Sequence, residues 1–589
     1  MVMKNNKQYN IPNPQFYRKA WSSLNGKWDY YVFADGETQK YQINVPFCPE
    51  SRLSGLGLKG YIKECAYARH FEIDSLSEYD RIVLHFGAVD YKAEVYVNDC
   101  LVGTHEGGYT PFEIDCTSAV KVGENRLCVK VYDDIHADVP SGKQSPKPHS
   151  FGCFYTRTTG IWQDVWLERT PKKYIKNVKF YPHIDMPSVD VELFVEGEGE
   201  AEIQIFYKNK LVGSAKSEIA FRKTFTVDLK EKHLWEPGNG RLYDVKITFA
   251  KDEVESYFGL REVCFDGEKF LVNGKSVFQR FVLDQGYNPE GGYTSPSDSW
   301  MIADIERGLR LGFNGARLHQ KVFEPRFLYH CDKMGYMVWG EFPSWGIKYD
   351  RLDSLPVFVR EWMETIERDF NHPSIVLWCP LNETWKDLED ARKTRDVRYI
   401  DAVYSLTKSI DETRPCVDVS GGFHGHATDL YDFHCYESYE KLEQYIKTLE
   451  NENVLDVPLL YDESEPKLRY FDGYPVNVSE YGGIRFSTTP LSGETATIDG
   501  CVVDCENSWG YGKGETNEDE FICRYKELTK LIMDCPKISG FCYTQLYDVE
   551  QEENGLFTYD RKPKLSEQAM DRIAARNKML AAIEKQDDK

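Results

Sequence analysis

The second half of the chain contains eight short apolar runs separated by amphipathic stretches, and this alternation constrains the fold more than any other feature. Strands that alternate with helices form parallel sheets, because each helix carries the chain back to the starting edge of the sheet. Eight such units within 263–589 predict a (β/α)8 TIM barrel, whose active site lies at the carboxyl ends of its strands. The runs are Val277–Leu283, Asn314–Leu318, Met337–Trp339, Ile375–Leu381, Pro415–Val419, Tyr431–Cys435, Val476–Ser479 and Ile538–Thr544.

The first part of the chain follows a different pattern, in which apolar and polar residues alternate with a period of two. Ile82, Leu84 and Phe86 fall on one face of such a run, as expected for a strand with one buried side. Many short runs of this kind predict a jelly-roll β-sandwich over 1–172. The next 90 residues or so, 173–262, continue the alternation and predict a smaller immunoglobulin-like β-sandwich. The predicted fold is therefore multidomain, with two sandwiches before the barrel.

The net charge excludes two classes of partner. Lys and Arg number 72 and Asp and Glu 95, so the formal net charge is 72 − 95 = −23. A chain this acidic is not expected to bind nucleic acid or an anionic membrane, because both require a cationic face. No apolar run is long enough to span a bilayer, and Met1–Asn10 has no apolar segment typical of a secretory leader. We expect a soluble cytoplasmic protein whose 16 scattered cysteines are reduced.

Two glutamates follow predicted barrel strands at corresponding positions. Glu383 lies two residues after the fourth run, and Glu480 directly follows the seventh. Strands four and seven are three steps apart in an eight-stranded barrel, so the two carboxylates can face each other across its mouth. Cleavage of a glycosidic bond requires such a pair, one group to protonate the leaving oxygen and one to attack the anomeric carbon or activate water. A separation of about 5–5.5 Å indicates retention of configuration, and about 6.5–9.5 Å indicates inversion.

These residues occur within longer motifs that resemble those of a known family. The chain is similar over nearly its whole length to glycoside hydrolase family 2, which includes β-galactosidases, β-glucuronidases and β-mannosidases. The two barrel signatures are Asn371–Glu383 and Ser479–Gly483. The motifs similar to the sugar-binding jelly roll of the family are Trp21–Trp28, Val45–Gly55, Phe86–Tyr91, Gly107–Phe112 and Gly160–Trp166.

The resemblance implies a retaining mechanism with distinct roles for the two glutamates. Glu383 would be the general acid/base, and Glu480 would be the nucleophile that forms a glycosyl-enzyme. Their pKa values must then differ, with that of Glu383 raised and Glu480 ionised.

The resemblance also implies a set of supporting residues. Asn382 would hydrogen-bond the sugar 2-hydroxyl, and Tyr436 would orient the nucleophile. Arg317, at the end of the second strand, would stabilise the nucleophile carboxylate electrostatically. His434 would point into the same site. Read from the residues alone, Arg317, Tyr436 and His434 could equally be an ion pair, a packed aromatic and a core histidine.

The chain departs from the family pattern around the sugar. Asp284 and Gln285 stand where the family has another polar pair after the first strand, and we expect Asp284 to line the sugar site. His319 is displaced by one position after the second strand. Tyr543 replaces the usual tryptophan after the eighth strand and would offer a smaller platform. These changes leave the identity of the sugar open.

Among the sugars, a β-D-galactoside is the leading expectation. An α-L-arabinopyranoside presents the same ring stereochemistry without the exocyclic CH2OH group, and a β-mannoside is a further alternative. The glucuronidases of the family hold the substrate carboxylate with an Asn-x-Lys pair, which is absent from residue 280 onward. The segment 548–555 is acidic instead, which argues against a glucuronide. A catalytically inactive carbohydrate-binding protein is the alternative outside enzymes, and the presence of both glutamates and Asn382 argues against it.

No cofactor is expected. Some relatives hold Mg2+ near the acid/base, and Glu341 is the nearby candidate here, although a lone glutamate is more often a hydrogen-bond acceptor. The expected partner is a carbohydrate substrate. Family relatives often form dimers or tetramers, so a homo-oligomer is an open expectation.

Overall fold

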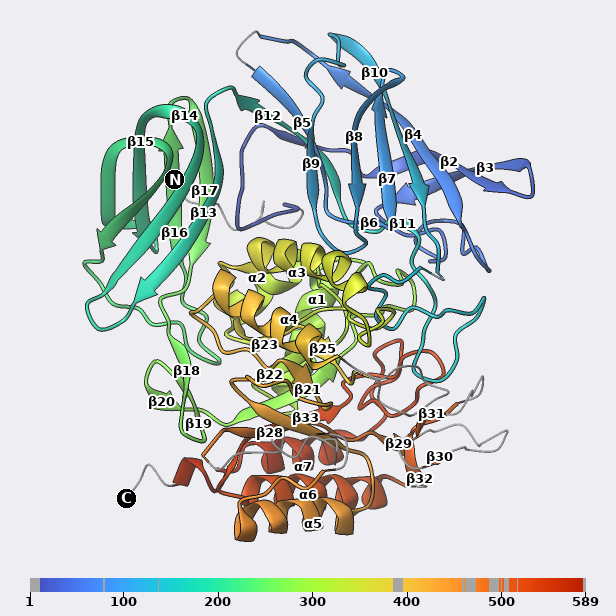
Figure 1. The fold of residues 1–589 in the computed structure, drawn as a ribbon, viewed down its shortest axis with the longest axis vertical. Coiled ribbons are helices and arrows are strands. Elements are labelled where there is room, and N and C mark those ends of the chain that lie inside the picture. The colour runs from blue at the N-terminus through green and yellow to red at the C-terminus, as the bar shows by residue number, and fades with distance from the viewer. Residues whose placement is uncertain are drawn as a thin grey trace.

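The computed structural model describes residues 11–77, 80–135, 137–384, 396–457, 460, 473–486, 497–498, 501–502, 508–515 and 517–585. The first ten residues, where no leader was predicted, lie outside this set. Three bodies follow one another along the chain, with two β-sandwiches at one end and a curled parallel sheet with its helices at the other (Figure 1).

The first body is an antiparallel sandwich of two main sheets. One sheet has the strand order β1-β12-β5-β9 and the other β3-β2-β4-β10-β7-β8. Ile82, Leu84 and Phe86 are buried between them, as their period-two spacing predicts. The strands are β1 (Trp21–Ser23), β2 (Gly26–Ala34), β3 (Glu37–Val45), β4 (Glu64–Ile73), β5 (Asp80–Phe86), β6 (Val89–Asp90), β7 (Lys92–Val97), β8 (Cys100–Glu106), β9 (Phe112–Asp115), β10 (Gly123–Tyr132), β11 (Gly160–Ile161) and β12 (Val165–Pro171).

The second body is a smaller antiparallel β domain with its own apolar core, and its strands have the order β13-β14-β16-β17, with β15 paired to β14. A short meander of three strands connects it to the barrel. The strands are β13 (Tyr174–His183), β14 (Ser188–Tyr207), β15 (Lys210–Asp228), β16 (Tyr243–Phe249), β17 (Asp252–Phe258), β18 (Val263–Asp266), β19 (Lys269–Val272) and β20 (Lys275–Ser276).

The third body is the TIM barrel, in which seven parallel strands pair in the order β24-β23-β22-β21-β33-β28-β27. They are β21 (Gln279–Asp284), β22 (Gly315–Leu318), β23 (Met337–Glu341), β24 (Ile375–Cys379), β27 (Tyr431–Cys435), β28 (Val476–Gly482) and β33 (Ile538–Thr544). The helices are α1 (Asp298–Arg310), α2 (Pro325–Met334), α3 (Leu355–Asp369), α4 (Val397–Ile410), α5 (Tyr439–Glu452), α6 (Glu518–Asp534) and α7 (Glu567–Asn577), with a 3-10 turn η1 (Leu352–Ser354).

The fifth apolar run, predicted as a full strand, occupies the gap between β24 and β27 with only short ladder contacts. The amide of Trp378 donates to the carbonyl of Pro415 at 3.0 Å, and that of Val417 donates to the carbonyl of Trp378 at 3.0 Å. Further along, β25 (Leu381–Asn382) pairs with β26 (Val419–Ser420). The amides of Cys416 and Asp418 donate to the side chains of Asp429 and Thr428, at 2.9 and 3.3 Å, and not to a neighbouring strand. Four more short strands, β29 (Ile484–Phe486), β30 (Thr497–Ile498), β31 (Cys501–Val502) and β32 (Tyr511–Glu515), lie in the loops after β28.

A long loop of the first body, 140–155, lies against the mouth of the barrel. The amides of Ser141 and Gly142 donate to the carbonyl of Trp345, at 2.8 and 3.0 Å. Gly142 has a φ of +58°, and a β-carbon there would lie 2.5 Å from the carbonyl oxygen of Gln320. Only glycine therefore allows the loop to approach the barrel so closely. The indole of Trp509 donates to the carbonyl of Gly152 at 2.7 Å and fixes the far end of the loop.

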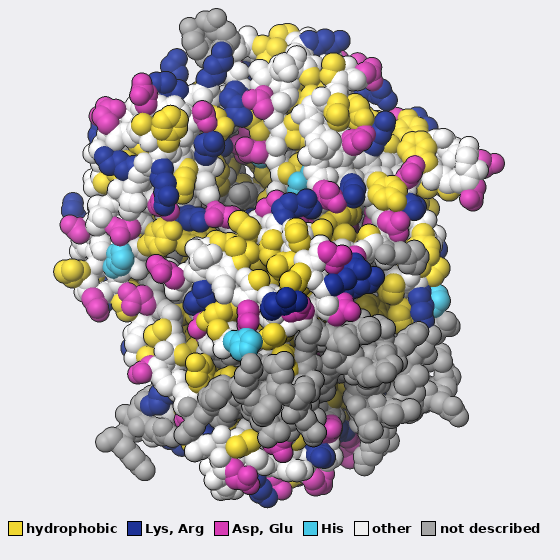
Figure 2. Space-filling model, viewed as in Figure 1, with side chains coloured by type: hydrophobic (Ala, Val, Ile, Leu, Met, Phe, Trp, Pro, Cys, Tyr) yellow, Lys and Arg dark blue, Asp and Glu magenta, His cyan; other side chains and the backbone are white. Residues whose placement is uncertain are grey.

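The charged surface side chains and the cysteine thiols are as the sequence composition predicts. Acidic and basic side chains are interspersed over the face shown in Figure 2. The cysteines whose side chains the structure describes are free thiols. Within those ranges, no helix has the length and apolar character needed to cross a membrane.

Candidate active site

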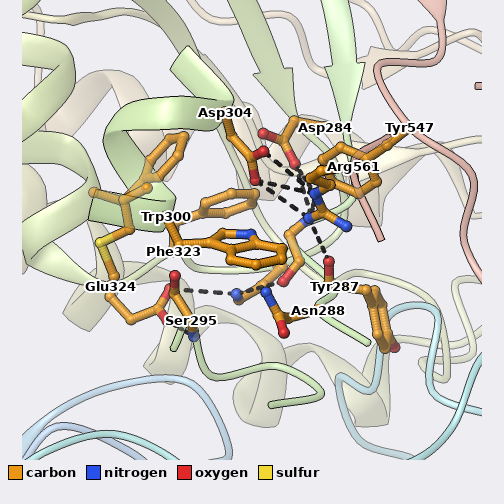
Figure 3. Close-up of a pocket in the computed structure, with 14 residues that line it drawn as sticks. Asp284, Tyr287, Asn288, Ser295, Trp300, Asp304, Phe323, Glu324, Tyr547 and Arg561 are labelled. Atoms are coloured by element: carbon orange, nitrogen blue, oxygen red, sulfur yellow. Dashed lines mark hydrogen bonds and ion pairs between the residues drawn. The ribbon is translucent and has the colours of Figure 1, made fainter. Parts of the chain in front are cut away.

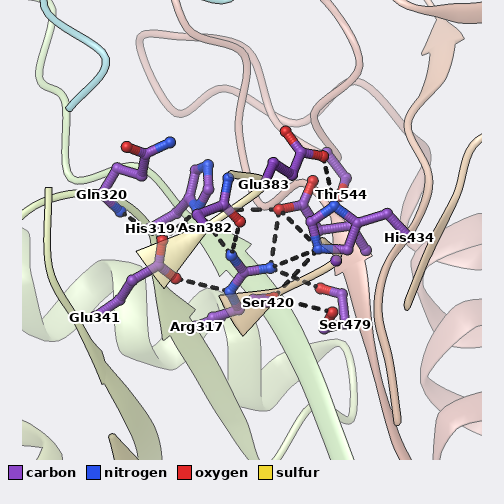
Figure 4. A network of polar contacts seen from close by, with 12 residues as sticks. Arg317, His319, Gln320, Glu341, Asn382, Glu383, Ser420, His434, Ser479 and Thr544 are labelled. Carbon is purple, nitrogen blue, oxygen red and sulfur yellow. Dashed lines mark hydrogen bonds and ion pairs between the residues drawn. The ribbon is translucent and has the colours of Figure 1, made fainter. Parts of the chain in front are cut away.

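The two predicted catalytic glutamates lie close together at the mouth of the barrel, and Figure 4 shows Glu383 beside His434 and Asn382 in the polar network there. Glu383 directly follows β25, and Glu480 lies within β28. One carboxylate oxygen of each and a ring nitrogen of His434 all lie within 4.8 Å of one another. Glu480 is 5% exposed, whereas the Glu383 side chain is partly exposed. Glu383 also has a φ of +38°, a left-handed backbone that non-glycine residues adopt at some energetic cost.

Arg317 is the centre of the polar network. It lies near the end of β22, is fully buried, and donates to Glu341, Glu480, Asn382 and the carbonyl of Ser479. Its Nε lies 2.7 Å from Glu341, and one terminal nitrogen lies 2.8 Å from Glu480. The other donates to the amide oxygen of Asn382 at 2.6 Å. A buried guanidinium is tolerated here because two carboxylates compensate its charge.

Tyr436 contacts the other oxygen of the nucleophile candidate. Its hydroxyl donates to Oε2 of Glu480 and lies 2.9 Å from the hydroxyl of Thr544. The ring of Tyr436 stacks on Tyr511, with centroids 3.7 Å apart and planes 6° apart. Glu480 is therefore held at both oxygens, by Arg317 on one and Tyr436 on the other.

The charges around Glu480 keep it ionised. Burial alone would raise the pKa of this carboxyl group, but the positive groups near it, His434 and Arg317 first, lower that pKa to about 2. A carboxylate with this pKa carries its negative charge at neutral pH.

His434 joins the two glutamates. Its Nδ1 lies 2.6 Å from Glu383, and its Nε2 lies 3.5 Å from Glu480. Burial opposes a charge on the ring, but the two carboxylates raise the pKa of His434 above its ordinary value. His319 lies 2.9 Å from Glu341 and 4.0 Å from Glu480, and burial lowers its pKa. The structure thus brings both predicted histidines to the site.

Asn382 presents an amide group beside both glutamates. Its oxygen accepts from Arg317, and its backbone carbonyl accepts from the indole of Trp345 at 3.1 Å. Its Nδ2 is buried and has no hydrogen-bond partner among the described residues. A buried donor of this kind is costly unless a ligand satisfies it.

Asp284 lies outside this cluster, contrary to the expectation that it lines the sugar site. Its carboxylate accepts from the hydroxyl of Tyr547 and from the amide of Gly286 at 2.9 Å. It borders a small cavity of about 20 Å3 in which Arg561 pairs with Asp304 at 3.2 Å (Figure 3). Burial, and then the charge of Asp304, raise the pKa of Asp284 to about 6.

Tyr543 also lies away from the glutamates. It is fully buried and packs edge-on against Tyr481 and against Tyr525 of α6. Successive residues of a strand point to opposite faces, so the neighbouring Thr544 faces the site instead and contacts Tyr436.

Glu341, the candidate near a metal, is occupied by protein donors. Arg317 binds one of its oxygens, and the other lies 2.9 Å from His319 and accepts from the amide of Gln320 at 3.1 Å. In the structure Glu341 is a hydrogen-bond acceptor that holds Arg317 in place.

Two groups at the site were not predicted. Lys143 comes from the loop of the first body, and its ammonium lies 4.2 Å from the ring centroid of Trp345. Tyr155 of the same loop donates to Glu552, which follows the last strand. The only sequence signal was the length of the loop, since long loops in compact domains are usually functional.

Three family models match the chain in sequence. The sugar binding domain of the glycosyl hydrolases family 2 matches residues 54–171, a second model of that family matches 173–261, and its TIM barrel domain matches 263–481. The chain belongs to glycoside hydrolase family 2.

Relatives within family 2 carry more than one specificity in their names. A β-glucuronidase of Streptococcus agalactiae is 25% identical over 86% of this chain and 87% of its own length. A β-galactosidase of Thermoanaerobacter pseudethanolicus is 29% identical over 57% of this chain, which spans about half (48%) of that longer protein.

Solved structures share the fold over almost the whole chain. A β-galacturonidase from Eisenbergiella tayi bound to galacturonate has a TM-score of 0.73, 20% identity, and covers 97% of this chain and 100% of its own. A β-D-glucuronidase of Dictyoglomus thermophilum has a TM-score of 0.76, 21% identity, and covers 97% and 99%.

Proposed function

We propose that this family 2 enzyme hydrolyses terminal β-linked sugars with retention of configuration, through a glycosyl-enzyme on Glu480. The observation that carries the proposal is the separation of the two carboxylates, whose nearest oxygens lie within 4.8 Å. Oxygens this close fit the nearer spacing of retaining enzymes better than the wider spacing that accommodates a water molecule, and they suit direct attack.

The electrostatics support this division of roles. Glu480, ionised and held by Arg317 and Tyr436, attacks the anomeric carbon while Glu383 protonates the leaving oxygen. In the second step Glu383 takes a proton from water, the water oxygen bonds to the anomeric carbon, and the bond to Glu480 breaks. The Nδ2 of Asn382, which has no hydrogen-bond partner among the described residues, supports a hydrogen bond to the sugar 2-hydroxyl.

A β-D-galactoside and a β-linked uronic acid are the two sugar classes that we propose to compare. The name of the Thermoanaerobacter relative supports the galactoside, and that of the streptococcal relative supports a glucuronide. An α-L-arabinopyranoside shares the ring of the galactoside.

The acidic segment 548–555 is weaker evidence against a uronide than its sequence suggests. Asp548 pairs with Lys564 at 2.8 Å, and Glu550 accepts from the amide of Thr156 at 3.1 Å. Glu552 is bound by Tyr155 and by the side chain of Asn554. These three carboxylates are engaged by protein donors, so their repulsion of an anionic sugar is reduced.

The test is a rate panel on aryl β-D-galactoside, α-L-arabinopyranoside, β-D-glucuronide, β-D-galacturonide, β-D-mannoside and β-D-glucoside. We expect Glu480→Ala to lower the rate on the preferred sugar at least about a thousandfold, because catalytic groups that act as a unit commonly contribute that much. Glu437→Gln is the matched control, since Glu437 is exposed near the mouth of the barrel and accepts from Tyr445 at 3.0 Å.

Proton NMR of the first product decides the stereochemistry. Retention releases the β-anomer before mutarotation. Release of the α-anomer from a β-glycoside, or an unchanged rate in Glu480→Ala, would refute the proposed mechanism. A protein that binds these sugars and hydrolyses none of them would support the carbohydrate-binding alternative.

A further inference from the structure

Lys143 brings a positive charge from the jelly roll to the active site of the barrel. The residue is 7% exposed, and its position in the loop is fixed on both sides. Its carbonyl accepts from the amide of Tyr155 at 2.8 Å, and the preceding Gly142 is hydrogen-bonded to Trp345. The loop therefore holds Lys143 in one place before any ligand arrives.

The ammonium group of Lys143 has no direct anionic partner in the described part of the chain. No hydrogen bond or ion pair to its nitrogen occurs among those residues, and its near neighbour is the face of the Trp345 ring. A buried charge is ordinarily compensated by a contacting counter-ion, and an ammonium carries three donors. Burial alone would lower the pKa of Lys143, but Cys153, Glu552, Glu480 and Glu383 act on it through longer-range charge and raise it, so the group stays cationic.

Lys143 is connected to the reacting groups through Trp345 and through its charge. Trp345, whose ring its ammonium faces, donates to the carbonyl of Asn382, the residue before Glu383. Lys143 also contributes to the low pKa of Glu480. A sugar held between Glu383 and Glu480 is therefore within the electrostatic reach of Lys143.

Gln285 contributes a buried acceptor that is linked to the same loop. Gln285 donates to the hydroxyl of Tyr155 at 3.1 Å, and its own Oε1 is buried without a partner among the described residues. Tyr155 in turn binds Glu552, one of the carboxylates that act on Lys143. The loop and Gln285 thus offer a charged donor and a free acceptor, which suits a sugar that carries both a carboxylate and hydroxyl groups.

We propose that Lys143 is a specificity-determining residue that donates hydrogen bonds to the carboxylate of a β-linked uronic acid in the active site. The inference rests on the proposed glycosidase function and deepens it, because it assigns the recognition of the anionic substituent to the jelly roll. Lysine suits this role as a compact charge with donors that can follow either oxygen.

Two other roles for Lys143 make different predictions. If it only packs on Trp345, its charge can be removed without loss of activity on any sugar. If it acts only by keeping Glu480 ionised, its removal lowers the rate on neutral and acidic sugars alike. Only recognition of a carboxylate predicts that the loss is greater on acidic sugars than on neutral ones.

The experiment compares Lys143→Met and Lys143→Arg with the full-length wild type on aryl β-D-galacturonide, β-D-glucuronide and β-D-galactoside. Methionine keeps the apolar stem over Trp345, and arginine keeps the charge. We expect Lys143→Met to lower kcat/KM for the preferred uronide about thirtyfold or more, because removing one partner of a buried charge pair has effects of that size. Its kcat/KM for the galactoside also loses the contribution of Lys143 to the low pKa of Glu480 but should fall much less, so the ratio of the uronide value to the galactoside value should drop at least about tenfold, and Lys143→Arg should retain part of the uronide activity.

Lys147→Met is the matched control. Lys147 belongs to the same loop, and its ammonium lies 4.0 Å from the ring centroid of Phe151, so the change removes a similar contact outside the site. Calorimetric binding of free D-galacturonate, D-glucuronate and D-galactose to wild type and Lys143→Met tests recognition without turnover. Melting curves by circular dichroism verify that each variant is folded.

The outcomes separate this inference from the proposed function. An equal loss on all sugars in Lys143→Met, no loss on any, or a wild type that prefers the galactoside and binds neither uronate would overturn the role of Lys143 alone. Unchanged turnover in Glu480→Ala would overturn the proposed function, while the binding measurements would still decide whether Lys143 recognises a uronate.

Discussion

The interface between the jelly roll and the barrel contains a carboxyl group whose ionisation should control stability. Glu361 of α3 is fully buried, and it accepts from the amide of Tyr109 in the jelly roll at 3.3 Å. Its Oε1 has no partner among the described residues. Burial raises the pKa of Glu361 from 4.5 to about 8, since few groups compensate its charge.

The sign of the effect follows from proton binding. Between about pH 4.5 and pH 8 the folded protein keeps the proton on Glu361 and the unfolded chain loses it. The free energy of unfolding therefore falls as the pH rises through this window, by up to about 1.4 kcal/mol per pH unit. A shift from 4.5 to about 8 gives a total of about 5 kcal/mol as an order of magnitude.

Glu361→Gln removes this pH dependence and keeps the acceptor for Tyr109. We expect wild type and variant to have similar urea midpoints at pH 5, and the variant to be more stable at pH 8.5. Buried Glu50 and Asp548, whose pKa values are raised to about 7, also make the free energy of unfolding depend on pH, but equally in wild type and variant. The difference between the two proteins therefore reports on Glu361. Identical pH profiles for the two proteins would refute the reasoning.

Two further predictions concern the nucleophile. Tyr436→Phe removes a hydrogen bond to ionised Glu480, and we expect kcat to fall roughly ten- to a hundredfold, because such bonds contribute about 1.5–3 kcal/mol. Steady-state kinetics with Tyr439→Phe as the control, an exposed tyrosine, measure this; an unchanged kcat would show that the hydroxyl does not act on the nucleophile. His434→Gln removes a positive charge that lowers the pKa of Glu480, so the acid limb of the kcat/KM profile should move to higher pH. A limb that stays in place would exclude that electrostatic role.

The barrel and the position of its glutamates could be predicted from the sequence because they depend on local patterns. Apolar runs mark buried parallel strands, and a residue that follows such a run lies at the mouth of the barrel by topology alone. This rule is sufficient to place Glu383 and Glu480 at the mouth of the barrel. The fifth strand was less regular than predicted, because the side chains of Asp429 and Thr428 accept from amides of this run, which a pattern of apolar residues does not reveal.

The remaining site residues depended on information that local patterns lack. Whether Tyr543 or Thr544 faces the site is decided by the phase of one strand, and a shift of one residue exchanges the two. Asp284 ends the first strand as expected, but Tyr547 and Gly286 bind it in a different network. Lys143 is separated from Glu383 and Glu480 by hundreds of residues, and only the packing of the jelly roll on the barrel brings it to them.

The loop that carries Lys143 and Tyr155 means that the jelly roll cannot be exchanged as an independent module. The hydrogen bond from Tyr155 to Glu552, which are 397 residues apart in sequence, ties this loop to the segment after the last barrel strand. A chimera that grafts another jelly roll onto this barrel would keep both glutamates and replace the surface that faces the sugar. Substrate range in such proteins can therefore change through the amino-terminal half while the reacting groups stay untouched.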